Sequence, residues 1–153
     1  MIEIKRILCP TDFSKASMSA LPYAVDIARL FKAQIFIMHV VPPLPALVEG
    51  AGIYIQLPVE YLASLRTEAD KLIDKMLLEQ IPREVKASKV LVDGDAAHEI
   101  LQAVEKFQID LITITTHGRT GWQHLILGSV AEKIVRMSKV PVLTLRGESV
   151  ADQ

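Results

Sequence analysis

The hydrophobic pattern of this chain alternates repeatedly between short strand-like runs and longer helix-like segments. Apolar runs of strand length predict five strands, at residues 4–10, 34–41, 85–92, 109–115 and 140–145. Apolar residues at helical spacing between these runs predict helices at residues 16–31, 59–80, 95–104 and 128–138. Strands that are each separated by a helix form a parallel sheet with right-handed crossovers and helices on both faces. We therefore expect an α/β fold with a five-stranded parallel sheet.

Length and composition agree with this fold. The chain has 153 residues, and we expect one domain over residues 1–153. Half of the residues are hydrophobic but only 5% are aromatic, so the apolar content is mainly Ile, Leu, Val and Ala, as in buried parallel strands. The formal net charge is −1 and the 17 basic residues are scattered, which argues against binding of nucleic acid or of an anionic membrane.

Targeting signals and disulfides are not expected. Residues 1–8 alternate apolar and polar side chains like a strand and lack the layout of a signal peptide. The most apolar stretch, residues 35–48, is broken by His39 and three prolines and is too short to span a bilayer. The lone cysteine, Cys9, lies in an apolar run and is interpreted as a buried small hydrophobe. These features predict a soluble cytoplasmic protein without membrane insertion.

The strongest functional pattern follows the fourth predicted strand, over residues 115–129. Gly118 comes shortly after the strand, where the absence of a Cβ lets backbone amides approach a phosphate. Gly128 and Ser129 then open a helix, whose free N–H groups and positive dipole end suit an anion. Arg119 can add a charged contact or remain a solvated loop residue. The alternative is that both glycines only serve turns and close packing.

A second polar cluster follows the first predicted strand, at residues 11–14. The Asp12 carboxylate can accept hydrogen bonds from a ribose hydroxyl or an adenine amino group, or it can cap the next helix. Ser14 is a candidate cap for that helix. Ligands of parallel sheets bind beyond the carboxyl ends of strands, where the strand order reverses. Two polar strand ends that face one another across such a point favour a binding site.

These segments resemble the universal stress protein family over essentially the whole chain and in the right order. The resemblance rests on residues 7–14, 38–41, 94–95, 109–112, the glycine segment and 141–143. The ATP-binding branch of that family has a motif of Gly, two residues, Gly, nine residues, Gly and then Ser or Thr. Here Gly118 and Gly128 enclose nine residues and Ser129 follows, but Thr115 stands at the first motif glycine. The Thr115 side chain can crowd the ligand, or its Cβ can point away and its hydroxyl bind the ligand.

The resemblance implies a Rossmann-like fold of the adenine nucleotide alpha hydrolase type, with strand order 3-2-1-4-5. It implies bound ATP, accompanied by a divalent cation such as Mg²⁺ or Mn²⁺ on the phosphate oxygens. It also implies an antiparallel homodimer in which the edge strand at residues 141–146 covers its counterpart in a second subunit. The residues that the resemblance assigns to the nucleotide site are Pro10, Thr11, Asp12, Val40, Thr115, Gly118, Arg119, Gly128, Ser129 and Val130.

Three functional hypotheses follow. The first is a nucleotide-dependent regulatory module in which ATP occupancy is read by an unidentified partner protein. The second is a slow ATPase or phosphotransferase, against which the chain offers no phosphate-loop lysine and no evident base. The third is a dimer without nucleotide that acts through protein contacts, a reading that the Thr115 departure supports.

Other segments leave their roles open. His39 and His117 could act in acid–base chemistry, although a histidine satisfied by backbone hydrogen bonds is commoner. Trp122 could contact a ligand or partner, but packing onto the domain is the expected role. The loop at residues 42–58 could be a flap, a contact surface or partly disordered. The dispersed histidines and single cysteine give no metal-ligand spacing.

Overall fold

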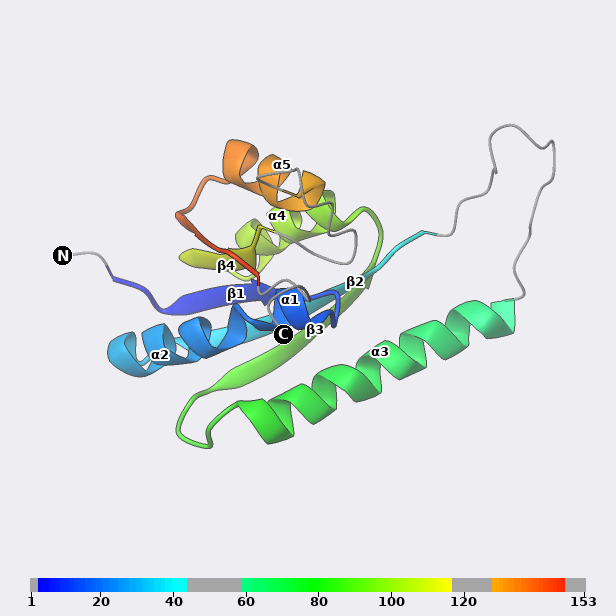
Figure 1. Cartoon of the computed structure of the whole chain (residues 1–153), viewed down its shortest axis with the longest axis horizontal. Coiled ribbons are helices and arrows are strands. Elements are labelled where there is room, and N and C mark those ends of the chain that lie inside the picture. Colours follow the sequence, from blue (N-terminus) through cyan, green and yellow to red (C-terminus); the bar gives the residue numbers. More distant parts are fainter. Residues whose placement is uncertain (1–2, 44–58, 117–127, 148–153) are drawn as a thin grey trace.

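Five parallel strands form one sheet in the computed structural model, which describes residues 3–43, 59–116 and 128–147. The strands are β1 (Arg6–Pro10), β2 (Gln34–Val41), β3 (Ala87–Asp93), β4 (Leu111–Thr115) and β5 (Val142–Leu145). Their order is β3-β2-β1-β4-β5, and every neighbouring pair is parallel (Figure 1). The predicted α/β fold and the order 3-2-1-4-5 are therefore confirmed. The order reverses between β1 and β4, where a ligand site is expected.

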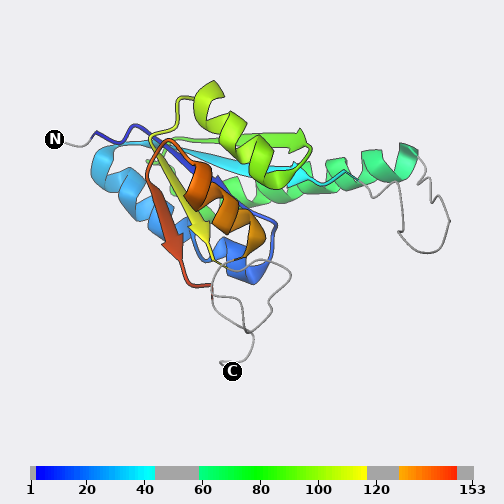
Figure 2. The same ribbon diagram turned by 90° about the horizontal axis from the view of Figure 1, so that it is seen from above.

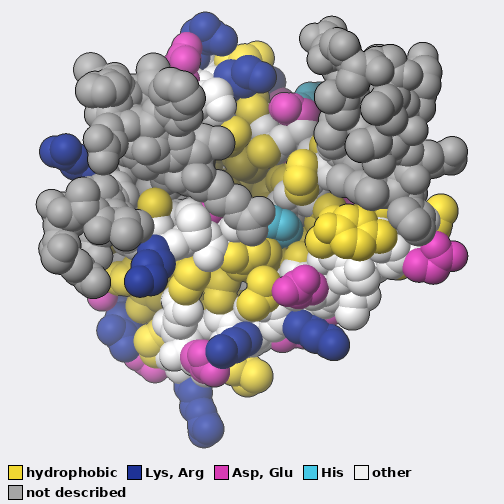
Figure 3. Space-filling view, turned by 45° about the vertical axis from the view of Figure 1, so that its right-hand side comes forward, with side chains coloured by type: hydrophobic (Ala, Val, Ile, Leu, Met, Phe, Trp, Pro, Cys, Tyr) yellow, Lys and Arg dark blue, Asp and Glu magenta, His cyan; other side chains and the backbone are white. Residues whose placement is uncertain are grey.

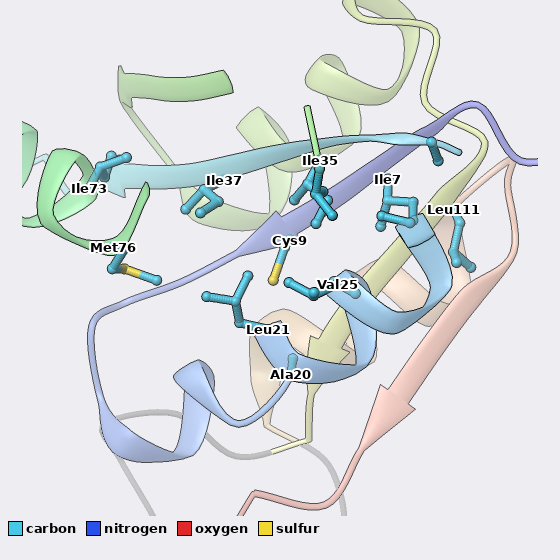
Figure 4. Close-up of a cluster of buried hydrophobic side chains, with 14 residues drawn as sticks. Ile7, Cys9, Ala20, Leu21, Val25, Ile35, Ile37, Ile73, Met76 and Leu111 are labelled. Atoms are coloured by element: carbon cyan, nitrogen blue, oxygen red, sulfur yellow. The ribbon is translucent and has the colours of Figure 1, made fainter. Parts of the chain in front are cut away.

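Helices cover both faces of the sheet (Figures 1 and 2). They are α1 (Lys15–Met18), α2 (Leu21–Phe31), α3 (Val59–Gln80), α4 (Ala96–Lys106) and α5 (Ser129–Met137). One buried cluster, the α2-side core, joins α2 and α3 to residues such as Ile7, Ile35 and Ile37 (Figure 4). A second cluster, the α4-side core, joins α4 and α5 to Leu8 and Ile112 on the opposite face. Successive residues of the strands alternate between these two cores, as strand geometry requires.

The first predicted helix is divided in two, which corrects the expectation of one helix over residues 16–31. Ser14 caps α1, because its hydroxyl oxygen accepts the N–H of Ser17 at 3.1 Å. The new helix α2 begins at Leu21 with Pro22 in its first turn. Proline has no N–H to continue the hydrogen bonding of a preceding helix but is well suited to the first turn of a new one.

Four strands, β1, β3, β4 and β5, begin two residues later than their apolar runs predict. At β1 and β4 the reason is Asp110, whose carboxylate oxygen Oδ2 accepts the N–H groups of Lys5 and Arg6, both at 2.8 Å. Asp110 thus binds the backbone of residues 5 and 6 just before the register pair Ile7–Leu111. The fifth strand begins at Val142, after Pro141, rather than at residue 140. The third runs from Ala87 to Asp93 rather than over residues 85–92.

The two edges of the sheet differ. Edge strand β3 is linked to α3 by Lys89, which forms ion pairs with Asp70 at 2.9 Å and Asp74 at 2.8 Å. Edge strand β5 has four residues, three of them half-buried and one exposed. The prediction that the last strand lies at the edge of the sheet is confirmed. Of the loop predicted at residues 42–58, residues 44–58 lie outside the described residues.

Cys9 is buried in the α2-side core, with its sulfur directed toward α2 near Leu21 and Val25 (Figure 4). Burial raises the pKa of this thiol to about 11, and a hydrogen bond with Thr113 opposes the shift only in part.

The thiolate is the reactive form, so we expect Cys9 to resist thiol reagents at pH 8 in the native protein and to react once urea unfolds it. The neutral thiol is favoured in the fold. Stability from this group is therefore complete below pH 9 and falls as the pH rises toward 11. Thiol labelling against urea concentration would check this, and fast labelling of the native protein would contradict it.

Candidate functional site

The carboxyl ends of β1 and β4 meet the start of α5 at the point where the strand order reverses. β1 and β4 are paired through Ile7–Leu111 and Leu8–Ile112, and each strand then leaves the sheet in a polar segment. At the end of β4 the N–H of Thr116 binds the carbonyl oxygen of Leu145, and the N–H of Gly128 binds that of Thr116 at 2.6 Å. This places the first turn of α5 directly against the end of β4, as nucleotide sites of parallel sheets require.

The turn between β1 and α1 is shaped by the hydroxyl groups of Thr11 and Ser17. Thr11 is 7% exposed, and its Oγ1 lies 3.0 Å from the Oγ of Ser17 and accepts the N–H of Phe13 at 3.0 Å. The Thr11 hydroxyl is therefore occupied in the turn itself. Ser17 was not among the predicted site residues, since its polar contacts depend on the turn rather than on any sequence pattern.

Asp12 lies in the same turn and is half-buried. Its Oδ1 accepts the N–H of Ser14 at 2.9 Å, while Ser14 caps α1. Asp12 is thus not the helix cap, which decides one alternative left open by the sequence. Its carboxylate shapes the turn that Pro10 and Thr11 begin, at the end of the central strand.

His39 of β2 faces this turn. Its Nδ1 lies 2.8 Å from the carbonyl oxygen of Thr11, and its ring centroid lies 4.3 Å from that of Phe13. Phe13 has a φ of 64°, in the left-handed region that side chains seldom adopt. The backbone-bonded alternative for His39 is therefore what the structure shows. The role of Phe13 had no signal in the sequence, because glycine rather than phenylalanine marks such a conformation.

Val40 lies on β2, two residues after Met38, which is the last residue of β2 that pairs with β1. The register ends at Pro10–Met38, and the N–H of Thr11 then binds the carbonyl oxygen of Met38 at 2.8 Å. In a strand, backbone groups of residues two apart point to the same side. The N–H and C=O of Val40 are therefore directed to the β1 side, past the end of β1.

The start of α5 packs closely on the end of β4. A Cβ at Gly128 would lie 3.0 Å from the carbonyl oxygen of Thr116, tighter than nearly all real Cβ contacts. Gly128 is the N-cap residue and has no side chain with which to cap α5. Ser129 and Val130 form the first turn, where backbone N–H groups lack intrahelical partners and the helix dipole is positive. The helix start predicted at Gly128 and Ser129 is present in the fold.

Thr115 is the last residue of β4 and is 6% exposed. Along β4, Leu111 belongs to the α2-side core, whereas Ile112 and Ile114 belong to the α4-side core. Because strand side chains alternate, Thr115 points to the α2 side, whereas α5 packs on the α4 side. The side chain at the departing motif position is therefore turned away from the helix start.

The face on which these strand ends open is apolar at its centre. Figure 3 shows hydrophobic side chains gathered there, with most Lys, Arg, Asp and Glu side chains toward its margin.

Four predicted residues lie outside the described residues: Gly118, Arg119, His117 and Trp122. Among residues 3–43, 59–116 and 128–147, no group of three His, Cys, Asp or Glu side chains could hold a metal ion. No helix in these ranges is long and apolar enough to cross a membrane.

A shallow cavity of about 230 Å³ lies away from the strand ends, between α2 and the end of α3. Its polar wall includes Arg29, which is paired with Glu84 at 2.7 Å and lies 3.9 Å from Asp26. The guanidinium in this cavity is thus already paired with carboxylates of the protein.

A doubly wound parallel sheet with strand ends and a helix start at its switch point defines a class of α/β proteins. The model of the universal stress protein family matches residues 3–146, and the chain belongs to this family. Universal stress protein MJ0531 of Methanocaldococcus jannaschii is 35% identical over 142 residues, which cover 93% of this chain and 82% of that protein.

Solved structures agree with this assignment. The structure of MJ0577, also from Methanocaldococcus jannaschii, has a TM-score of 0.81 and 27% identity and covers 97% of this chain and 99% of its own. A universal stress protein in complex with cAMP has a TM-score of 0.63 at 18% identity, over 95% of this chain and 99% of its own. One from Archaeoglobus fulgidus in complex with dAMP has a TM-score of 0.56 at 19% identity, over 95% of this chain and 100% of its own. At these identities the last two show the shared fold.

Proposed function

We propose that this chain is an ATP-binding regulatory module of the cytoplasm, whose nucleotide occupancy is read by a partner protein. The observation that carries the proposal is the start of α5, held against the end of β4 at the switch point of the sheet. The complexes of other universal stress proteins with cAMP and dAMP support an adenine nucleotide as the class of ligand.

The adenine ring is assigned to the ends of β1 and β2. The C=O and N–H of Val40 point past the end of β1, so they can accept from the adenine amino group and donate to the adjacent ring nitrogen. The half-buried Asp12 carboxylate lies in the turn between β1 and α1, where it can accept a hydrogen bond from a ribose hydroxyl. Pro10 and the backbone of Thr11 form the neighbouring wall.

The phosphates are assigned to the start of α5. The first-turn N–H groups of Ser129 and Val130 suit an anion, and the Ser129 hydroxyl adds a donor. Gly118 and Arg119 would complete this cradle from the preceding segment. A Mg²⁺ or Mn²⁺ ion would be held by phosphate oxygens rather than by a protein carboxylate cluster.

Thr115 is compatible with this assignment. Its side chain points to the α2 side of the sheet, while the phosphates would lie at the start of α5 on the α4 side. A protein without nucleotide is therefore the weaker alternative.

A binding role is favoured over catalysis by the contacts of the polar side chains. Asp12 Oδ1 accepts the N–H of Ser14, and His39 Nδ1 binds the Thr11 carbonyl, so both side chains shape the site. A slow ATPase remains the alternative that phosphate release over hours would reveal.

Melting of the protein with ATP or GTP, each with Mg²⁺, tests the proposal. Guanine presents an acceptor where adenine presents its amino donor, so GTP would face the Val40 carbonyl with an oxygen. We expect ATP to raise the melting temperature and an equal concentration of GTP to raise it far less. Equal shifts would contradict the adenine site, and no shift with either would contradict the proposed function.

We further propose a homodimer through the edge strand at residues 141–146. α2 carries exposed Tyr23 and Leu30, and Ile27 between them packs on the same core as Leu143 and Leu145 of β5. Pairing of β5 with its counterpart would cover this apolar edge. Light scattering should give about twice the chain mass of 17.0 kDa, and a monomer mass would contradict the dimer.

A further inference from the structure

His39 contacts the one turn that joins the candidate adenine and ribose positions. It lies on β2 one residue before Val40, and its side chain faces the α2 side, as do those of Ile35 and Ile37. Its Nδ1 lies 2.8 Å from the carbonyl oxygen of Thr11, 28 residues earlier in the chain. A carbonyl oxygen only accepts hydrogen bonds, so Nδ1 carries the proton in this contact.

The hydrogen bond between His39 and Thr11 fixes the orientation of the peptide plane between Thr11 and Asp12. The Thr11 carbonyl and the Asp12 N–H belong to the same planar peptide unit. His39 binds the carbonyl end of that unit, and the Ser17 hydroxyl oxygen accepts from the Asp12 N–H at 3.3 Å. The plane is therefore held from both ends, and its orientation sets the direction in which the Asp12 side chain leaves the backbone.

Phe13 completes the arrangement. Its φ of 64° is a left-handed conformation, which costs a residue with a Cβ about 1–2 kcal/mol. Its ring packs on the His39 imidazole with centroids 4.3 Å apart and planes tilted by 31°. Its N–H binds Thr11 Oγ1 at 3.0 Å. Contacts with His39 thus support both the peptide before Asp12 and the strained residue after it.

We infer that His39 is a positioning residue for the adenine nucleotide, acting through Thr11 and Asp12. The inference rests on the proposed ATP site. The Nδ1 proton of His39 holds the Thr11–Asp12 peptide so that the Asp12 carboxylate is presented to the ribose. Loss of that donor lets the turn relax and weakens nucleotide binding, although the strands beneath it remain paired.

Two amide substitutions distinguish the role of Nδ1 from that of Nε2 in the His39 imidazole. In His39→Asn the side-chain NH₂ can occupy the position of Nδ1 and donate to Thr11, whereas in His39→Gln it reaches the position of Nε2. We expect the ATP dissociation constant, measured by calorimetry, to stay within about threefold of wild type for His39→Asn. For His39→Gln and His39→Leu we expect it to rise about tenfold or more, the loss typical of one hydrogen bond.

Urea unfolding of the ligand-free variants separates positioning from stability. Weaker ATP binding by His39→Gln at a stability equal to that of His39→Asn supports the inference. Equal affinities for these two variants, or affinity losses that only follow stability losses, would overturn it. If wild-type protein itself binds no ATP, the proposed function fails and the inference fails with it, an outcome that the wild-type titration alone identifies.

The tautomer of His39 gives a test that needs neither ATP nor a folded variant. Nitrogen NMR of the ligand-free wild-type protein should show a proton on Nδ1 of His39. A neutral ring that carries its proton on Nε2 would overturn the inference whatever the outcome of the titrations.

Discussion

Replacement of Gly128 with valine is expected to abolish stabilisation by ATP while the sheet remains folded. A Cβ at this position lies 3.0 Å from the Thr116 carbonyl oxygen, a backbone atom that cannot swing away. The N-cap conformation of Gly128, φ −67° and ψ 152°, is open to any residue, so the cost comes from the close approach alone. The start of α5 must move from the end of β4 to admit the side chain. The N–H groups that we assign to the phosphates move with it.

The expected size of the effect is a loss of affinity of at least about 100-fold, since several charge-assisted hydrogen bonds are misaligned together. Overpacking at a tight contact costs about 1–3 kcal/mol of stability. Titration with ATP at a temperature where Gly128→Val is folded would measure the affinity separately from this cost. Unchanged ATP affinity in Gly128→Val would place the phosphates elsewhere.

A matched glycine control is available at Gly94, between β3 and α4. Gly94 has a φ of 150°, and a Cβ there would meet the Glu99 side chain at 2.9 Å, so Gly94→Ala is also strained. We expect Gly94→Ala to lower stability but to keep ATP binding. Ser129→Ala should fall between these extremes, with affinity about tenfold weaker through loss of one hydroxyl donor. Equal affinity losses in Gly94→Ala and Gly128→Val would mean that general destabilisation explains both.

Truncation of Ile112 to alanine is expected to destabilise the protein by about 2–5 kcal/mol. Ile112 is fully buried near the start of β4, where it contributes to the α4-side core with Leu8 and Ile134. β4 joins the two halves of the sheet, because it pairs with β1 on one side and β5 on the other. A cavity at this position weakens the α4-side core, which packs α4 and α5 on the sheet. The cost is a large part of the about 5–15 kcal/mol by which proteins of this size are stable.

Urea unfolding would measure this loss, and a graded series makes it specific. Ile112→Val removes a single methylene and should cost about 0.5–1.5 kcal/mol. Leu78→Ala removes an apolar side chain that is 84% exposed on α3 and should change stability by less than about 0.5 kcal/mol. A similar loss in Ile112→Ala and Leu78→Ala would contradict the assignment of the core.

The succession of helices and strands could be predicted because the hydrophobic periodicity of the sequence indicates it. The predicted helix at residues 59–80 has the bounds of α3, and the predicted strand at residues 34–41 has the bounds of β2. Asp95 caps α4 at the start of the helix predicted for residues 95–104, accepting the N–H of His98 at 3.0 Å. The division between α1 and α2 was missed, although Pro22 was visible, because the apolar spacing continues across the break. The late starts of β1 and β4 were missed because Asp110 binds the backbone of Lys5 and Arg6, which lie 105 and 104 residues earlier in the chain.

The candidate site could be predicted only in part. Glycine spacing and a helix start are local features, so Gly128 and Ser129 could be found from the sequence. The arrangement around Thr11 depends on contacts with Ser17 and with His39, which lies 28 residues further along the chain. No local pattern reveals such contacts. The direction of the Thr115 side chain likewise required knowledge of which core each residue of β4 joins.

Calorimetric titration of ATP with Mg²⁺ into the wild-type protein tests the central claim most directly. The account predicts saturable binding of one ATP per chain. It also predicts that ATP at 100 times its dissociation constant stabilises the fold by about 2.7 kcal/mol, which raises the melting temperature by roughly 5–10 °C. A titration without binding heat, together with an unchanged melting temperature at millimolar ATP, would contradict the claim that this chain is an ATP-binding universal stress protein.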